Sequence, residues 1–333
     1  MIRFFDRTKE TGNSRVFYHL INGEYAAALD LLKKSYEGKD IPDDYYFLMG
    51  GILRKMNDFE GALQIQKNLF TADKIYPNNI VAQELVANLI ALGKDKEAVN
   101  FISDFLKKED DPKLKEILPY LLYTIEDFET AAEHFKKMDN SVMVSYCYYQ
   151  KALKLGGNDS EFSAYLLKSL KYNNSLRSVR FELAGYYFQN GKNGKGLDLL
   201  IEVMYGDLIK SIDDLYYIRD KFKTYADLLQ FERLLDKRVN ENSSNPFYYI
   251  YLSEEALSNG DVEKGKDILV TYSNNYNIPR VILKHYAKLL GDQFLSNIFM
   301  NEHLYQCDNC KAKFINFFSI CPSCRYVDTI IAL

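Results

Sequence analysis

The chain has 333 residues, of which 47% are hydrophobic and 26% are charged, so its composition is that of a globular protein and not of a disordered one. Its formal net charge of −4 argues against the overall positive field that holds nucleic acid, and we expect no nucleic-acid partner. No apolar run near the start approaches the ~20 residues that a membrane-spanning helix needs, and the hydrophobic region of a secretory signal is missing. We therefore expect a cytoplasmic protein.

Residues 1–13 are predicted to be an N-terminal extension, and helical repeats are predicted over residues 14–298. One signal recurs along this stretch: a polar or glycine-containing turn, then a small residue that begins a new apolar-periodic segment. The small residues are Ala28, Ala62, Ala98, Ala131, Ala164 and Gly196, and Gly265 follows further on. The first six are separated by 34, 36, 33, 33 and 32 residues. A period near 34 is the length of the tetratricopeptide repeat (TPR), which has two helices per unit.

The internal pattern of each repeat supports this interpretation. Where the two helices of a TPR cross, the first helix (A) needs a small residue twelve positions before that of the second helix (B), because a larger side chain would hold the backbones apart. The pairs with this spacing are Gly50 with Ala62, Ala184 with Gly196, and Ser253 with Gly265. The turns carry residues that tolerate the left-handed helix stop, namely Asn57, Gly93, Asn190-Gly191 and Asn259-Gly260.

These patterns predict an all-α, TPR-type helical solenoid. We expect about eight helix pairs between Ser14 and Asn275, a closing helix from about Ile278 to Asn297, and no strand before residue 304. Pro119 lies inside a helical pattern and is expected to kink or restart its helix. Stacked repeats leave a concave surface lined by A helices, which typically binds peptides or partner domains.

Clusters of aromatic residues fall on predicted A helices, and two interpretations of them stay open. The clusters are Tyr45-Tyr46-Phe47, Tyr186-Tyr187-Phe188 and Tyr248-Tyr249-Ile250-Tyr251. Their helical spacing favours packing between helices. Some of the tyrosines can instead be anchors for a partner in the groove, since tyrosine is enriched at interfaces.

The last thirty residues, 304–333, are predicted to be a small metal-binding tab of the rubredoxin or zinc-ribbon kind. Cys307 and Cys310 form one C-x2-C turn, and Cys321 and Cys324 form a second turn ten residues later. Two such turns complete a tetrahedral site of four thiolates, which suits one Zn²⁺ or Fe ion. Four thiolates leave no open coordination position, so the site is predicted to be structural, or redox-sensing if the ion is iron.

Two disulfides would require export, for which the sequence shows no signal, and a redox C-x2-C motif would need a βαβ setting that is missing. The segment between the knuckles is rich in aromatic residues, and we expect a pair of short strands that dock on the last helices. The fifth cysteine, Cys147, is expected to be a small buried hydrophobe.

A search for catalytic motifs finds none. The four histidines occur outside any H-E-x-x-H motif, and no G-x-S-x-G or G-K-[ST] phosphate loop is present. Paired acids such as Asp213-Asp214 lie near predicted helix starts, where carboxylates favour the helix dipole. We expect no enzymatic activity and assign no catalytic or cofactor-binding residues.

The TPR array together with the double knuckle resembles the LapB (YciM) family, the lipopolysaccharide assembly protein B of Gram-negative bacteria. The likeness is greatest in Tyr305-Gln306-Cys307-Asp308-Asn309-Cys310, the ten-residue spacer, and Cys321-Pro322-Ser323-Cys324-Arg325. A second, smaller likeness lies in Gly51-Ile52-Leu53-Arg54 and Ala62-Leu63-Gln64-Ile65-Gln66. The family carries a rubredoxin-like metal tab at this place.

The resemblance implies an adaptor that couples an FtsH-type membrane protease to the LpxC deacetylase and so regulates lipopolysaccharide synthesis. It also implies other lipopolysaccharide assembly factors as partners and peripheral association with the cytoplasmic face of the inner membrane. The family has an N-terminal membrane anchor that this sequence lacks, so either the anchor was removed or this is a soluble relative. The alternative is a generic soluble TPR scaffold with a structural metal cap and unrelated partners. The sequence leaves zinc or iron, and monomer or homo-oligomer, open.

Overall fold

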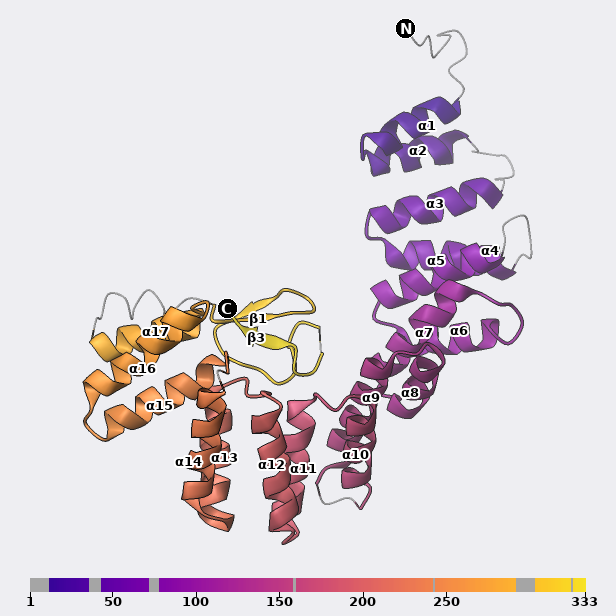
Figure 1. The fold of residues 1–333 in the computed structure, drawn as a ribbon. Helices are drawn as coiled ribbons and strands as arrows, with labels where there is room; N and C mark the ends of the chain where they lie inside the picture. The colour runs from indigo at the N-terminus through magenta and orange to yellow at the C-terminus, as the bar shows by residue number, and fades with distance from the viewer. Residues whose placement is uncertain are drawn as a thin grey trace. The chain divides into compact units, whose positions relative to one another are not determined.

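The computed structural model describes residues 12–35, 43–71, 78–157, 160–241, 243–291, 303–324 and 326–333, and these contain seventeen α-helices and three short β-strands (Figure 1). The chain divides into two compact units, Met1–Met138 and Asp139–Leu333. Within the described ranges no helix combines the length and the apolar character needed to cross a bilayer. The limits predicted for the extension, the repeats and the tab stay a proposal, since residues 1–11 and 292–302 lie outside the described part.

The first unit consists of four helix pairs that follow one another along the chain. Its helices are α1 (Gly12–Ile21), α2 (Tyr25–Ser35), α3 (Asp43–Lys55), α4 (Phe59–Thr71), α5 (Asn78–Ala91), α6 (Asp95–Phe105), α7 (Pro112–Thr124) and α8 (Phe128–Lys137). Within each pair the turn contains a residue with positive φ, at Gly23, Asn57, Gly93 and Glu126. These left-handed residues stop one helix and start the next, as predicted for Asn57 and Gly93.

The second unit continues the same arrangement with four more pairs and a single further helix. These are α9 (Ser141–Leu155), α10 (Phe162–Tyr172), α11 (Arg177–Gln189), α12 (Asn193–Tyr205), α13 (Ile212–Tyr225), α14 (Leu228–Asn240), α15 (Pro246–Ser258), α16 (Val262–Asn275) and α17 (Arg280–Leu290). Odd-numbered helices from α9 to α15 are the A helices of their pairs. The fold is therefore an all-α, TPR-type solenoid that ends in a small four-cysteine knuckle, as the sequence predicts.

The small residues at the helix crossings confirm most of the predicted register. Ala62, Ala98 and Ala131 are fully buried. A Cβ on Gly265 would lie 3.2 Å from the backbone oxygen of Ser253, whose hydroxyl donates to the Gly265 carbonyl at 2.9 Å. The predicted crossing therefore brings these two backbones into direct contact.

One crossing differs from the prediction. Ala164 is exposed, so it does not lie between α9 and α10. Two buried serines make the close approach instead, because the Ser145 hydroxyl donates to the Ser169 carbonyl at 2.8 Å and the Ser169 hydroxyl donates to the Ser145 carbonyl at 2.9 Å. Serine replaces alanine here because each hydroxyl satisfies a carbonyl of the facing helix.

Pro119 does not restart its helix, since α7 runs unbroken from Pro112 to Thr124. It is buried and lies twelve residues before Ala131, the position that holds the small residue of an A helix in other repeats. A compact ring without an N–H fits this crossing at the expense of one helical hydrogen bond.

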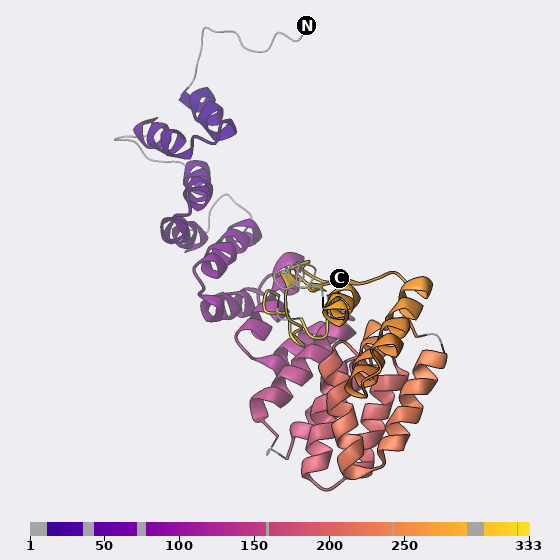
Figure 2. The ribbon, with the colours of Figure 1, turned by 90° about the vertical axis from the view of Figure 1, so that its left-hand side faces the viewer.

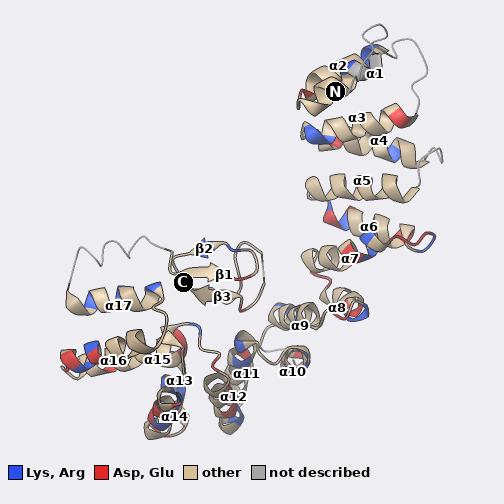
Figure 3. Ribbon diagram, turned by 45° about the horizontal axis from the view of Figure 1, so that its top comes forward, with Lys and Arg blue, Asp and Glu red and all other residues tan. Residues whose placement is uncertain are grey.

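The aromatic clusters act mainly in packing. Tyr248, Tyr249 and Tyr251 are all buried, and the Tyr249 and Tyr272 rings meet edge to face with centroids 5.0 Å apart. Tyr46 of the first cluster is 37% exposed. Figure 3 shows Lys and Arg mixed with Asp and Glu along many of the helices, as expected of solvated helix faces.

Candidate metal centre

The tab is a three-stranded antiparallel sheet of order β2-β1-β3, formed by β1 (Tyr305–Cys307), β2 (Lys313–Phe314) and β3 (Ile330–Ala332). The third strand had not been predicted, because its partner β1 lies more than twenty residues earlier in the chain. Cys307 ends β1 opposite Ile330, and Cys321 follows a bridge between Ile320 and Val327. The two knuckles are thereby fixed to the same small sheet.

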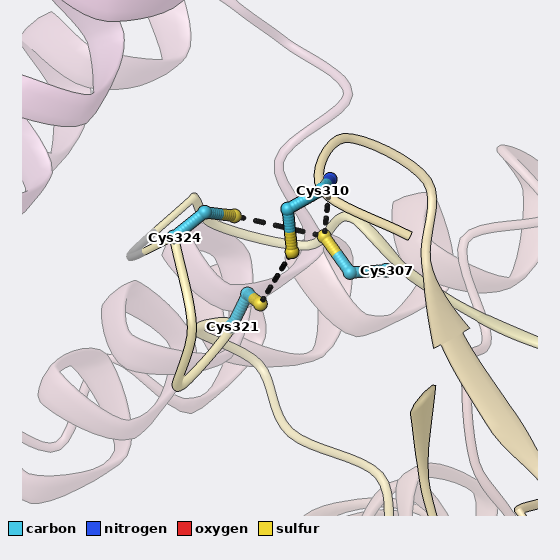
Figure 4. Close-up of side chains that lie close together, drawn as sticks. All are labelled: Cys307, Cys310, Cys321 and Cys324. Atoms are coloured by element: carbon cyan, nitrogen blue, oxygen red, sulfur yellow. Dashed lines mark hydrogen bonds between the residues drawn. The ribbon is translucent and has the colours of Figure 1, made fainter. Parts of the chain in front are cut away.

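The structure brings all four predicted cysteines together, and their sulfur atoms lie within 4.8 Å of one another (Figure 4). The two closest pairs join one knuckle to the other: Cys307 Sγ is 3.7 Å from Cys324 Sγ, and Cys310 Sγ is 3.7 Å from Cys321 Sγ. In the described part of the chain, this is the one group of metal-ligating side chains that converges in this way.

These distances fit a metal ion and not a disulfide. A tetrahedral site with metal–sulfur bonds of about 2.3 Å places its sulfurs about 3.8 Å apart, whereas a disulfide needs about 2.05 Å. All four cysteines are free thiols. Such a site can hold one Zn²⁺ or Fe ion with its coordination shell complete.

The surroundings of the first knuckle favour thiolate. Cys310 donates its backbone N–H to Cys307 Sγ at 3.5 Å, and Thr329 Oγ1 lies 3.2 Å from the same sulfur. Burial acts to raise the pKa of Cys307, but these hydrogen bonds outweigh burial and lower that pKa to about 6. At Cys321, by contrast, burial raises the pKa to about 12, so a bound cation would be needed to hold this sulfur as thiolate.

The interior of the tab is made largely of its own ligands. Cys307, Cys321 and Ile330 form the buried cluster, with Phe314 and Phe317 packed against it. A core of this size buries too little apolar surface to fold alone. Further stability must therefore come from outside this core, and docking on the helices supplies part of it.

Helix α9 provides the first docking contact. The Tyr146 hydroxyl donates to the Val327 carbonyl at 3.1 Å, and the Tyr146 ring meets Tyr326 edge to face with centroids 5.4 Å apart. Cys147, the next residue, is fully buried and burial raises its pKa to about 12, as expected of an inert cysteine in the interior.

Helix α11 provides a charged contact that motif searching had missed. The Arg177 guanidinium makes two bonds to Asp214 of α13, with Nε 2.8 Å from Oδ2, and donates to the Ser319 hydroxyl at 3.0 Å. Its Nη1 lies 3.6 Å from Asp328 Oδ1. The Asp328 carboxylate also accepts the backbone N–H of Ser178 at 2.8 Å and the Ser178 hydroxyl at 2.5 Å. Burial raises the pKa of Asp328, and Arg177 and Ser178 oppose that shift.

The tab was predicted to dock on the last helices, and this is right only in part. Arg280 of α17 donates its backbone N–H to the Leu333 carbonyl, and its guanidinium donates to the His303 carbonyl at 3.3 Å. The other contacts lie on α9 and α11, well before the end of the solenoid (Figures 1 and 2). All these helices except α17 are A helices of their pairs, so the tab covers part of the A-helix face of the second unit.

The charged residues at the first knuckle pair with each other. The ammonium of Lys311, which follows Cys310, forms an ion pair with the Asp308 carboxylate at 2.7 Å. Asp214, expected to favour a helix dipole, does accept the N–H of Ser211 at 3.1 Å at the start of α13. Arg325 lies outside the described residues.

No protein-family model matches the chain, and no curated relative matches it. Similar solved structures include a tetratricopeptide repeat protein from Parabacteroides merdae, at 13% identity over 84% of this chain and 97% of that chain, with a TM-score of 0.36. The C-terminal part of a TPR repeat-containing protein from Cytophaga hutchinsonii is 15% identical over 67% and 92%, with a TM-score of 0.39. The TPR2AB domain of yeast Sti1, solved as a complex with pHSP90, is 10% identical over 67% and 95%, with a TM-score of 0.31.

Proposed function

We propose that the protein is a non-enzymatic adaptor whose A-helix faces bind segments of other proteins. The observation that carries this proposal is that part of one A-helix face already binds polypeptide, namely the tab of the same chain. The Tyr146 hydroxyl donates to a backbone carbonyl of the tab. The backbone N–H of Ser178 donates to the Asp328 carboxylate, and the Arg177 guanidinium donates to the Ser319 hydroxyl. The same face thus offers the donors and aromatic surface that recognition of a partner requires.

We further propose that Cys307, Cys310, Cys321 and Cys324 bind one Zn²⁺ or Fe ion and that this ion maintains the tab in its docked form. The distances between the sulfurs support this proposal, as does the small core of the tab. Elemental analysis of the purified protein should find one ion per chain, and the visible spectrum separates the two metals, since a zinc site is colourless. Metal-free protein with an unchanged tab would contradict the proposal.

For the partners, we propose the role that the tail resemblance implies. The adaptor links an FtsH-type protease to the LpxC deacetylase and thereby regulates lipopolysaccharide synthesis, at the cytoplasmic face of the inner membrane. The convergence of the four cysteine sulfurs supports the part of the resemblance that lies in residues 304–333.

The test is a cross-linked pull-down from a Gram-negative lysate with the full chain as bait. Recovery of the protease or the deacetylase, and a raised deacetylase level when the gene is deleted, are the expected results. A suitable control bait carries Lys264→Gln, at an exposed position of the B helix α16, and should recover the same partners. Recovery of neither enzyme and an unchanged deacetylase level would favour the generic scaffold with unrelated partners.

A further inference from the structure

The four cysteines of the tab differ in how far solvent reaches them. Cys307 and Cys321 are fully buried, Cys324 is partly exposed, and Cys310 is exposed. The fifth cysteine, Cys147, is fully buried in α9 and is not one of the four converging sulfurs. Oxidation of cysteine follows thiolate character and exposure, so an oxidant that approaches this group from solvent meets Cys310 first.

Cys310 has a second sulfur within reach on the other knuckle. Its Sγ lies 3.7 Å from Sγ of Cys321, and the other short distance, also 3.7 Å, joins Cys307 to Cys324 (Figure 4). A disulfide needs about 2.05 Å, so an approach of about 1.7 Å turns the first of these contacts into a bond. Because both short distances cross from one knuckle to the other, the geometry favours a disulfide between the knuckles over one within either C-x2-C motif.

A peroxide supplies the chemistry for this bond. The Cys310 thiolate attacks one oxygen of hydrogen peroxide, the O–O bond breaks, and the hydroxide that leaves takes a proton from solvent to become water. The Cys321 thiolate then attacks the sulfur of the resulting sulfenic acid, the S–S bond forms, and a second hydroxide leaves and is protonated to water. Two thiolates thereby lose two electrons, and one peroxide is reduced to two molecules of water. The electrons come from sulfur, so the reaction needs no redox chemistry from the ion and can occur with Zn²⁺.

The disulfide removes half of the ligand set. The thiolate is the form of cysteine that binds a metal ion, and a sulfur in a disulfide has lost that charge. Only Cys307 and Cys324 then remain as thiolates, whereas a closed tetrahedral site needs four ligands. An ion bound by the four cysteines is therefore released to solvent when Cys310 and Cys321 are joined.

The second knuckle is connected to the contacts that dock the tab. The Cys321 N–H donates to the Tyr326 carbonyl at 2.8 Å. The Tyr326 ring packs on Tyr146 of α9, and Asp328, two residues further on, accepts two bonds from Ser178 of α11. Hydrogen bonds form over a range of only about 2.7–3.2 Å, so a displacement of the second knuckle toward the first weakens these contacts.

We propose that the tab is a peroxide-sensitive switch, in which a reversible disulfide between Cys310 and Cys321 releases the bound ion and undocks the tab from α9 and α11. In the reduced protein the tab occupies the Tyr146 hydroxyl and the Ser178 N–H, and in the oxidised protein both donors are open. A dithiol reductant and a new ion restore the docked form. This inference rests on the proposed metal centre and names a regulation of that same site.

The sequence lets one digest separate the two kinds of disulfide. Trypsin cleaves after Lys311, Lys313 and Arg325, so each knuckle lies in a peptide of its own. Zinc-loaded full-length protein is treated with equimolar hydrogen peroxide, the remaining thiols are alkylated, and the digest is analysed by mass spectrometry without reduction. We expect the two knuckle peptides to be joined, with fragmentation assigning the bond to Cys310 and Cys321. A disulfide within a C-x2-C motif leaves the two peptides separate.

The same samples report the ion and the docking. A chromogenic chelator should detect the release of one Zn²⁺ per chain together with the loss of two thiols. Hydrogen exchange should become faster at the Ser178 amide and at residues 326–328, whose contacts hold the tab on the helices. Amides of α3 and α4 in the first unit should exchange at unchanged rates. Dithiothreitol with added Zn²⁺ should return all of these values to those of the untreated protein.

Matched variants assign the first step to Cys310. Cys310→His keeps a zinc ligand at this position and removes the sulfur that forms the disulfide, so the variant should retain its ion in equimolar peroxide. Cys324→His makes the same exchange outside the proposed disulfide and should still release its ion and join the two peptides. Elemental analysis verifies that each untreated variant binds zinc. Where a variant fails to do so, the peptide mapping of the unchanged chain decides.

Three results would overturn the switch: a disulfide confined to one knuckle, an ion that stays bound in peroxide, or unchanged exchange at Ser178 after the ion has left. Metal analysis of the untreated protein separates this failure from that of the metal centre. If the untreated protein contains one ion per chain and any of these results follows, the switch is wrong and the metal centre stands. If the untreated protein contains no ion, both proposals are wrong.

Discussion

Replacing Arg177 with methionine should undock the tab from the middle of the second unit. The guanidinium joins α11 to α13 through Asp214 and to the tab through Ser319 and Asp328. Its side chain is only 9% exposed, and both carboxylates are buried. Methionine keeps a long apolar stem against the Phe317 ring but leaves two buried carboxylates without their cation.

The expected loss of unfolding free energy depends on the hydrogen bonds that Asp214 and Asp328 keep in the variant. Removing one partner of a buried ion pair costs about 3–5 kcal/mol. Asp214 still accepts the N–H groups of Lys210 and Ser211, and Asp328 still accepts two bonds from Ser178, so we expect the lower limit of about 3 kcal/mol. For a unit of about 200 residues, this corresponds to a fall in the melting temperature of roughly 6–12 °C.

Urea unfolding gives the free-energy change, and hydrogen exchange of the tab amides reports local undocking. Arg180→Met is the matched control, because Arg180 lies on the same helix but bonds Glu202 and Asn174, which are outside the tab. Glu202 is largely exposed, and the control should cost no more than about 1 kcal/mol. The reasoning is refuted if both variants lose the same stability or if exchange in the tab is equal in both.

Three further predictions concern the four cysteines, the docking of the tab and His285, a buried residue of α17. Cys321→Ser with Cys324→Ser should abolish the one-ion stoichiometry in elemental analysis and speed hydrogen exchange in the tab, whereas retained metal would contradict the four-thiolate site. Tyr146→Phe removes the bond to the Val327 carbonyl and should cost about 1–3 kcal/mol in urea unfolding; no measurable change would show that water replaces the hydroxyl. Burial lowers the pKa of His285 in the folded protein, so as the pH falls the unfolded chain binds a proton before the folded protein does. The free energy of unfolding is therefore unaffected by this residue above the unfolded pKa of about 6.5 and decreases as the pH drops below that value. Urea unfolding at pH 7.5 and 5.5 should show a smaller pH-dependent loss for His285→Gln than for the unchanged protein, and equal losses would reject this assignment.

The parts of the fold that can be predicted from the sequence depend on residues at short, regular separations along the chain. Small residues recur every 32 to 36 positions because each helix pair repeats the same crossing, and Asn57 or Gly93 marks the turn because few residues adopt positive φ. The four cysteines likewise belong to two short motifs, and the structure brings their sulfurs together. The predicted crossing at Ala164 was wrong because α9 and α10 approach each other at Ser145 and Ser169. Serine is not a recognisable marker of a TPR crossing in the way that alanine and glycine are.

The contacts that could not be predicted connect residues far apart in the chain. Arg177 is 37 positions from Asp214 and 142 positions from Ser319, and nothing in the residues around it differs from an ordinary helix start. Partner choice between buried charges is decided by packing, and packing is a property of the whole unit.

The tab depends on the A helices of the second unit for its stability, and it covers part of their exposed face. A three-stranded ribbon whose buried cluster consists of two cysteines and Ile330 cannot offset the entropy of ordering its own chain, so its docked form depends on its contacts with the helices. The ion that we propose for the four cysteines would add to this stability. In return, the docked ribbon occupies the hydrogen-bond donors of Tyr146 on α9 and Ser178 on α11. Its residues Leu304 and Tyr305 also line a pocket beside α15 and α17. If the four thiolates hold an ion, as we propose, that ion would influence how much of the A-helix face of the second unit remains open. A variant that loses the ion should lose the closed pocket as well, even though none of the four cysteines lines it.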